Sequence, residues 1–137
     1  MGIHDYQWQD LPKELAFKAN DIVTFMCEKL HENDDPNRPQ MILECRIVTS
    51  EKSEDYVGEK VNLYFPFKTK QGTSNKNTFK FLQLFFKEEM ATRKSIPYEK
   101  LVGKIFTAIS DISTYEGKDY LKWDKYQVIG DAESQEF

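Results

Sequence analysis

The sequence predicts a mainly β domain with five strands and one helix between the third and fourth strands. Five segments are rich in β-branched and aromatic residues, which is the composition of strands. One further segment has apolar residues at helical spacing. The last two β-rich segments flank a short turn that contains Gly117, which is typical of a hairpin. At 137 residues, the chain suits a single domain with one core.

The first three strands are expected at residues 22–30, 40–49 and 60–67, separated by polar connections. Strand side chains alternate between the two faces of a sheet. In the third strand, Leu63 and Phe65 therefore belong to a core, whereas Asn62 and Tyr64 fall on the other face. This alternation predicts one dry face and one wet face.

The helix is expected over residues 77–91, where an apolar stripe recurs at steps of three and four. We expect this stripe to cap the core; it comprises Phe79, Leu82, Phe86 and Met90, widened by Phe81, Leu84 and Phe85. Pro97 argues against a further helix before the hairpin. The hairpin strands are expected at residues 101–110 and 119–129, and the first has apolar groups on both faces, so something covers or closes the sheet.

Five strands with a helix after the third follow the order of an OB-fold, a small closed barrel with a helix at one end. Closure would remove the sheet edges and explain the two-sided apolar character of the hairpin. The sequence thus predicts a five-stranded OB-fold barrel over residues 1–130, including an N-terminal lead-in, and an acidic tail over residues 131–137. An open α+β sheet is the main alternative.

The composition narrows the functional classes. A net charge of −4 is not that of a general nucleic-acid binder, although a local cationic groove is still compatible with it. No apolar run approaches the roughly 20 residues of a membrane helix, and the N-terminus lacks a signal-peptide pattern. We therefore expect a soluble, cytoplasmic protein. Cys27 and Cys45, in two neighbouring strands, are expected to be reduced core thiols.

Catalytic signatures are missing from the sequence. It contains no phosphate-binding glycine loop and no paired cysteines at zinc spacing. His4 and His31 lie far apart in polar segments, without a neighbouring nucleophile. The acidic loop after His31 lacks the spacing of a calcium site. We expect no catalytic residue, no metal, no cofactor and no enzymatic activity.

Rings and ammonium groups interleave in the hairpin, and single-stranded nucleic acid is bound by such stacking and phosphate contacts. The groove of an OB-fold crosses strands two and three and is bounded by loops. The nucleic-acid-binding candidates are Arg46, Lys60, Asn62, Tyr64, Tyr115, Lys118, Tyr120, Lys122 and Trp123. Trp123 shares its side of the strand with Leu121, so a groove position and a core position are both open. A second basic cluster comprises Lys68, Lys70, Lys76 and Lys80. It either guides the backbone of the nucleic acid or is ordinary solvated surface, and both interpretations are open.

The chain ends in an acidic segment that closes on an aromatic residue. With the element order, and with Gly103-Lys104 and Tyr115-Glu116-Gly117, this tail resembles phage-encoded single-stranded DNA-binding proteins of the OB-fold type. The resemblance implies that the partner-binding residues of the tail are Asp131, Glu133, Glu136 and Phe137.

The resemblance implies sequence-independent DNA binding in phage replication and recombination, within the host-cell cytoplasm. It also implies that the tail recruits replication or recombination proteins, with Phe137 as the anchor; a homo-oligomer is compatible with the sequence. The alternative is an OB-type protein-interaction module without nucleic-acid binding, such as a structural or inhibitory phage protein. The net negative charge favours this alternative.

Overall fold

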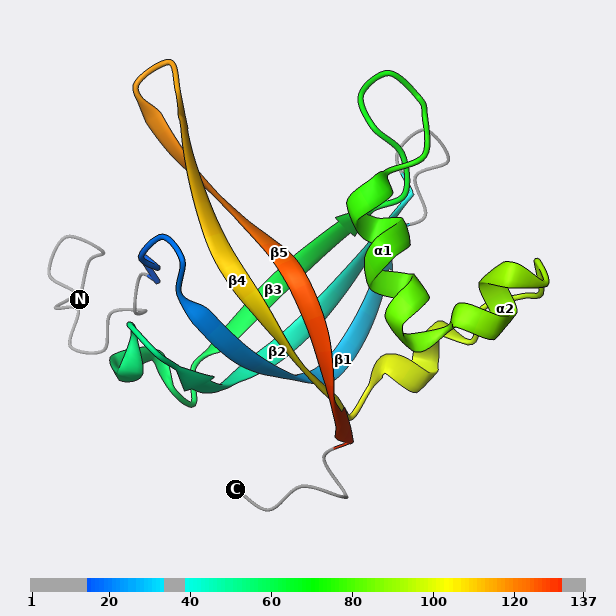
Figure 1. Cartoon of the computed structure of the whole chain (residues 1–137), viewed down its shortest axis with the longest axis horizontal. Coiled ribbons are helices and arrows are strands. Elements are labelled where there is room, and N and C mark those ends of the chain that lie inside the picture. Colours follow the sequence, from blue (N-terminus) through cyan, green and yellow to red (C-terminus); the bar gives the residue numbers. More distant parts are fainter. Residues whose placement is uncertain (1–14, 34–38, 132–137) are drawn as a thin grey trace, which may run out of the picture.

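The computed structural model describes residues 15–33 and 39–131. It contains strands β1 (Ile22–Asn33), β2 (Gln40–Ser50), β3 (Lys60–Pro66), β4 (Lys104–Tyr115) and β5 (Lys118–Asp131). The helices are α1 (Lys76–Phe85) and α2 (Lys87–Ala91), with the short 3₁₀ helices η2 (Glu54–Tyr56) and η3 (Tyr98–Leu101). The mainly β class, the five strands and a helix after the third strand are thereby confirmed (Figure 1).

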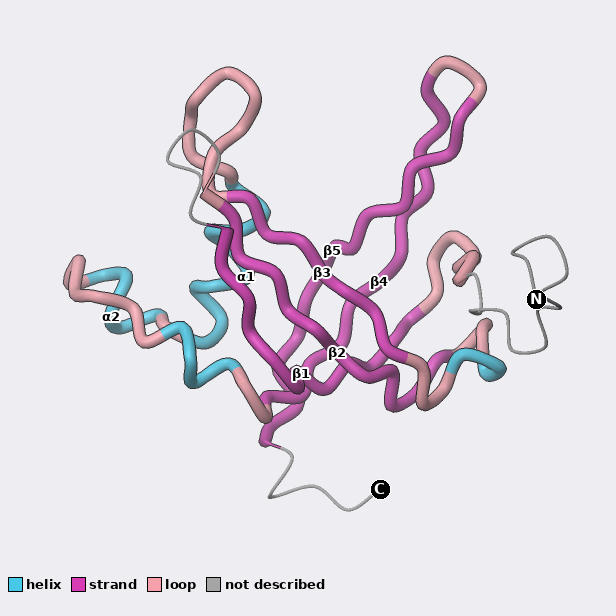
Figure 2. Tube along the Cα trace, turned by 180° about the vertical axis from the view of Figure 1, so that it is seen from behind, coloured by secondary structure: helices cyan, strands magenta, loops and turns pink. Residues whose placement is uncertain are grey.

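The five strands form one antiparallel sheet in the order β3-β2-β1-β4-β5 (Figure 2). Within the described residues no ladder joins β3 to β5, so the sheet is open and the barrel closure expected from the sequence is not found. The reason lies in α1, whose Phe81 ring sits between the two edges. Its centroid is 4.3 Å from that of Phe65 on β3 and 4.9 Å from that of Tyr126 on β5. Side-chain packing therefore occupies the place where hydrogen bonds would close a barrel.

The hairpin of β4 and β5 extends past the rest of the sheet (Figure 1). Its turn consists of Glu116 and Gly117, both in the left-handed region with φ of 51° and 77°. Two positive φ values define a type I′ turn, whose twist matches that of the flanking strands. The turn predicted from the sequence is confirmed. β4 begins and ends later than the expected range of 101–110, and β5 extends beyond the expected range of 119–129 at both ends.

A bulge in β5 reverses the direction of its side chains. Lys125 has φ of 52°, and the register with β4 shifts between Thr107 and Ile109. Trp123 and Tyr126, three residues apart, would face opposite sides of a regular strand, yet both pack against the core. The Trp123 ring lies 4.9 Å from the rings of both Phe17 and Phe25. The Trp123 side chain is thus half-buried: it packs against the core and is partly exposed to solvent.

The expected helix is interrupted at Phe86, which has non-helical angles and separates α1 from α2. Phe81, Leu82 and Phe86 are buried, as expected. The expectation that Phe79 and Leu84 face the core is wrong, because they are 47% and 45% exposed. The buried side of α1 carries Thr78, Phe81 and Leu82, and Phe79 and Leu84 fall on the two flanks of that side.

Two hydrogen-bonded contacts fix the start of α1. The Asn75 side-chain oxygen accepts hydrogen bonds from the backbone N–H groups of Asn77 and Thr78, at 3.1 and 3.2 Å. The Thr78 hydroxyl donates to the carbonyl oxygen of Pro66, at 2.7 Å. The N-terminal turn of α1 is therefore tied directly to the end of β3.

Candidate nucleic-acid interface

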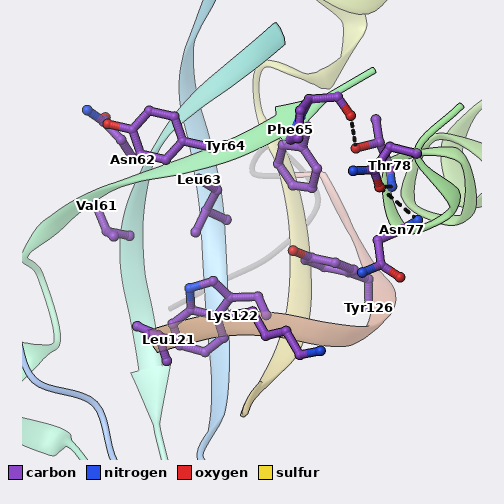
Figure 3. Close-up of a pocket in the computed structure, with 13 residues that line it drawn as sticks. Val61, Asn62, Leu63, Tyr64, Phe65, Asn77, Thr78, Leu121, Lys122 and Tyr126 are labelled. Carbon is purple, nitrogen blue, oxygen red and sulfur yellow. Dashed lines mark hydrogen bonds between the residues drawn. The ribbon is translucent and has the colours of Figure 1, made fainter. Parts of the chain in front are cut away.

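A pocket of about 310 Å³ lies between the edge strands β3 and β5, next to the start of α1 (Figure 3). Its lining comes from residues 61–66 of β3, residues 75, 77 and 78 at the start of α1, and residues 121–123 and 126 of β5. This volume is at the lower end of the range for ligand pockets. We call it the seam pocket, because it occupies the gap between the two sheet edges.

The inner wall of the seam pocket is apolar and aromatic. Figure 3 shows Leu63 and Phe65 pointing from β3 toward β5, where Tyr126 lies opposite Phe65. The Phe65 and Tyr126 ring centroids are 5.8 Å apart. Leu63 and Phe65 are both buried, so this wall of the pocket is part of the core. A flat apolar group entering this pocket would meet rings and aliphatic carbon.

The rim of the seam pocket is polar. On the β3 side, Asn62 and Tyr64 point away from the interior (Figure 3), and the Tyr64 side chain is 59% exposed. On the β5 side, Lys122 is exposed, with its Nζ atom 3.9 Å from the Asp111 carboxylate. Because both members of that ion pair are exposed, it holds Lys122 only weakly. An ammonium group and a free ring therefore face solvent on opposite sides of the pocket.

Tyr126 contributes a phenol hydroxyl to the seam pocket. Burial raises the pKa of this phenol, and the nearby Asp124 carboxylate raises it further. The group therefore stays protonated at neutral pH and acts as a hydrogen-bond donor. Within the described part of the chain, that hydroxyl has no hydrogen-bond partner. It is positioned to donate to a group inside the pocket.

A second pocket of about 300 Å³ adjoins the first. Its lining residues are Asn77, Lys80, Phe81, Leu84, Asp124, Lys125 and Tyr126. Asn77 and Tyr126 line both pockets and so form the wall between them. We call this the helix pocket, because α1 supplies most of its lining.

The outer face of β2 and β3 holds two of the candidate cations in ion pairs. The Arg46 Nη1 atom donates to the carbonyl of Gly58 at 2.9 Å, and its Nε atom lies 3.4 Å from Glu28. Lys60 lies 4.0 Å from Glu44, which also meets His31 at 3.3 Å.

The hydrogen bond with His31 lowers the pKa of Glu44, with smaller contributions from Lys29 and Lys60. Carboxylates thus accompany the cations on this face. The sequence alone does not reveal this pairing, because Glu28 and Arg46 meet only through the register of β1 with β2.

One face of the hairpin carries four of the candidates. In the register, Tyr115 lies opposite Lys118, Ser113 opposite Tyr120, and Asp111 opposite Lys122. Residues directly opposite each other in an antiparallel pair share a face. This face therefore carries Tyr115, Lys118, Tyr120 and Lys122, all exposed, with Trp123 on the other face.

The structure thus brings together four of the nine predicted nucleic-acid-binding residues at the seam pocket: Asn62, Tyr64, Lys122 and Trp123. Tyr115 and Lys118 are at the tip of the hairpin, with Tyr120 between tip and pocket. Arg46 and Lys60 lie opposite each other at the start of β3, away from Tyr64. Sequence reasoning missed Asn77 and Tyr126. The interleaved rings of the hairpin were a signal for Tyr126, but the bulge that turns it inward was not visible.

The second basic cluster surrounds the loop between β3 and α1 and continues onto α1. Lys68, Lys70, Lys76 and Lys80 are all exposed. Lys68 bridges to Ser74 through the backbone, which closes the loop. Among the described residues, no carboxylate lies within 4.0 Å of these four ammonium groups. Figure 1 shows this loop and the hairpin projecting to the same side of the molecule.

Only the first residue of the expected tail is described. Asp131 is the last residue of β5, and its Oδ1 atom lies 2.6 Å from the Nζ atom of Lys104. Glu133, Glu136 and Phe137 lie outside the described residues.

In residues 15–33 and 39–131, no group of three or more His, Cys, Asp and Glu side chains is placed to hold a metal ion. No helix in that part of the chain is long and apolar enough to cross a membrane. Comparison with known proteins finds no protein-family model that matches the chain and no curated protein of similar sequence.

Proposed function

We propose that the chain binds single-stranded DNA, without sequence preference, along the seam between β3 and β5. The observation that carries the proposal is the seam pocket itself. Its inner wall is aromatic, and its two sides present the exposed Tyr64 ring and the Lys122 ammonium group. Bases stack on exposed rings whatever their identity, and ammonium groups neutralise the phosphates between them.

Two neighbouring surfaces support a path for a strand. From Lys122 toward the tip, the hairpin face continues with Tyr120, Lys118 and Tyr115. On the other side of the seam pocket, toward α1, the path continues over exposed lysines that have no described carboxylate within 4.0 Å. Each phosphate contact releases counterions, so binding along this path would weaken steeply with salt.

The architecture and the biological role are parts of the same proposal. The open sheet, with α1 between its two edges, is compatible with an OB-fold whose closing pair is replaced by side-chain packing. The resemblance of the sequence supports a role in phage DNA replication and recombination in the host cytoplasm. Asp131 is already paired with Lys104. The proposed recruitment of partner proteins is therefore carried by the other tail residues, Glu133, Glu136 and Phe137.

A protein-interaction module is the second candidate, and a specific observation favours it. On the outer face of β2 and β3, Arg46 and Lys60 are accompanied by Glu28 and Glu44, so this face does not offer free cations to a phosphate backbone. The net charge of −4 agrees with a non-nucleic-acid partner. Direct titration with DNA separates the two candidates.

The test is the fluorescence anisotropy of labelled oligo-dT at two salt concentrations. We expect binding by the full chain that weakens with salt. Tyr64→Ala should weaken it about 5- to 140-fold, since a stacked base contributes about 1–3 kcal/mol. Lys122→Gln should make the salt dependence less steep, by about 0.7 per lost phosphate contact.

Val57→Ala and Lys100→Gln are the matched controls, because both residues are exposed and line neither pocket. They should leave the affinity unchanged. If the wild-type chain gives no anisotropy change even at low salt, DNA binding is ruled out and the protein-interaction module is favoured.

A further inference from the structure

We infer that the helix pocket is a phosphate-binding subsite for the nucleotide that follows the one in the seam pocket. The inference rests on the proposed function and makes it more specific: the ligand is a strand of at least two nucleotides, and one of its phosphates lies between Lys80 and Lys125. The two lysines come from different elements, α1 and β5, and line the same pocket.

The continuity of the two pockets is the first argument. Asn77 and Tyr126 line both, so a chain leaving the seam pocket enters the helix pocket without crossing another element. The Tyr126 hydroxyl and the Asn77 amide at this boundary provide polar groups that suit a sugar or phosphate oxygen. Ligands that fill only one pocket would leave this polar boundary unused.

The bulge in β5 is the second argument. Asp124, Lys125 and Tyr126 are consecutive and line the helix pocket. Side chains of a regular strand alternate between its two faces, so the packing of both Trp123 and Tyr126 against the core requires an irregularity between them. The positive φ of Lys125 provides it. Bulges are frequent next to functional sites because they redirect a side chain in this way.

The remaining lining fits the rest of a nucleotide. Phe81 and Leu84 make the apolar part of the pocket, and the Leu84 side chain is 45% exposed. Lys80 and Lys125 are both exposed, and no described carboxylate lies within 4.0 Å of either ammonium group. An apolar surface beside two available cations suits a sugar or base next to its phosphate.

Asp124 gives the inference an unusual test. Its Oδ1 atom accepts a hydrogen bond from the backbone N–H of Lys125 at 2.8 Å, so it supports the bulge. Its negative charge also opposes a phosphate in the same pocket. Asp124→Asn keeps an oxygen acceptor at this place and removes the charge, so we expect it to tighten oligo-dT binding severalfold.

The main experiment compares two charge-matched double variants in the oligo-dT titration. Lys80→Gln/Lys125→Gln should weaken binding at low salt at least tenfold and make the slope of log K against log salt less steep by at least about 0.7. Lys87→Gln/Lys94→Gln removes the same charge from exposed residues outside both pockets, in and just after α2. It should change both quantities much less. Thermal unfolding by circular dichroism verifies that both variants are folded.

Three results have distinct meanings. Weakening by the pocket variant alone, together with tightening by Asp124→Asn, supports the subsite. Equal effects of the two double variants overturn the subsite and leave the proposed DNA binding intact. If the wild-type chain does not bind oligo-dT, the proposed function and the subsite are both overturned.

Discussion

The Asp21 carboxylate accepts a hydrogen bond from the Ser50 hydroxyl at 2.8 Å, and both side chains are buried. Its other oxygen accepts from the backbone N–H of Lys52, at 3.0 Å. On the opposite side, the backbone N–H of Asp21 donates to the Ser110 hydroxyl oxygen at 2.9 Å. One residue thus connects the start of β1 with the end of β2 and with β4.

We expect Asp21→Ala to lower the free energy of unfolding by about 3 kcal/mol, because it leaves the buried Ser50 hydroxyl and the Lys52 N–H without an acceptor. Urea denaturation measures this change. Glu51→Ala, an exposed carboxylate nearby, is the control and should stay within about 0.5 kcal/mol of wild type. Equal stability of the two variants would show that the Asp21 contacts are not needed.

The bulge at Lys125 predicts that glycine has opposite effects on stability at two positions of β5, Lys125 and Lys122. A side chain in the left-handed region costs about 1–2 kcal/mol, so Lys125→Gly should not destabilise the fold and should stabilise it slightly. Lys122→Gly, in a regular part of β5, should cost about 0.5–1 kcal/mol. Urea denaturation of both variants tests the difference, and a loss of stability in Lys125→Gly equal to that in Lys122→Gly would contradict it.

Tyr126 predicts a loss of stability in alkali. Burial raises its pKa in the folded protein, whereas in the unfolded chain a tyrosine titrates near pH 10. Above about pH 10 the unfolded state therefore binds fewer protons than the folded state, and the free energy of unfolding falls as pH rises. Below that pH the contribution is fully present.

Tyr126→Phe isolates this effect from other tyrosines, including Tyr98, whose pKa is also raised by burial. The measurement is the free energy of unfolding between pH 8 and pH 11, a range set about the ordinary tyrosine pKa. We expect a shallower decline in the variant than in wild type. Parallel curves would mean that the Tyr126 phenol is not buried.

The burial of both thiols predicts that they react slowly in the native protein. Cys27 lies directly opposite Cys45, and both are buried and free. The hydrogen bond with Cys27 and burial raise the pKa of the Cys45 thiol, so it carries little thiolate. Ellman's reagent should label the native protein slowly and the guanidinium-unfolded protein rapidly, at both cysteines. Rapid labelling of the native protein would contradict the buried pair.

The sequence predicted those elements whose signal is local. The hairpin turn at Gly117 and the alternation of Leu63 and Phe65 against Asn62 and Tyr64 depend only on residues close together in the chain, and the structure agrees with both. The sequence predicted a closed barrel where the structure has an open sheet. The open sheet depends on Phe81 reaching between β3 and β5. No local pattern contains that contact.

The candidate site was predicted in part for the same reason. Tyr64 and Lys122 stand out from their neighbours on exposed strand faces and lie on either side of the seam pocket. Tyr126 was hidden by a bulge, since a shift of one residue reverses the predicted face. The ion pair of Arg46 with Glu28 was hidden as well, because these residues meet only through the pairing of β1 with β2.

The pairing of β1 with β4 has a consequence for how the chain reaches this structure. Strand β2 pairs with β1 and with β3, and β4 pairs with β5. Each of these pairs joins strands that follow each other in the sequence, so only a short loop has to close. The ladder from Ile22–Ile109 to Met26–Ile105 instead encloses everything between them. Closing so long a loop costs entropy before its contacts form. We therefore expect two preformed halves to dock in the rate-limiting step of folding.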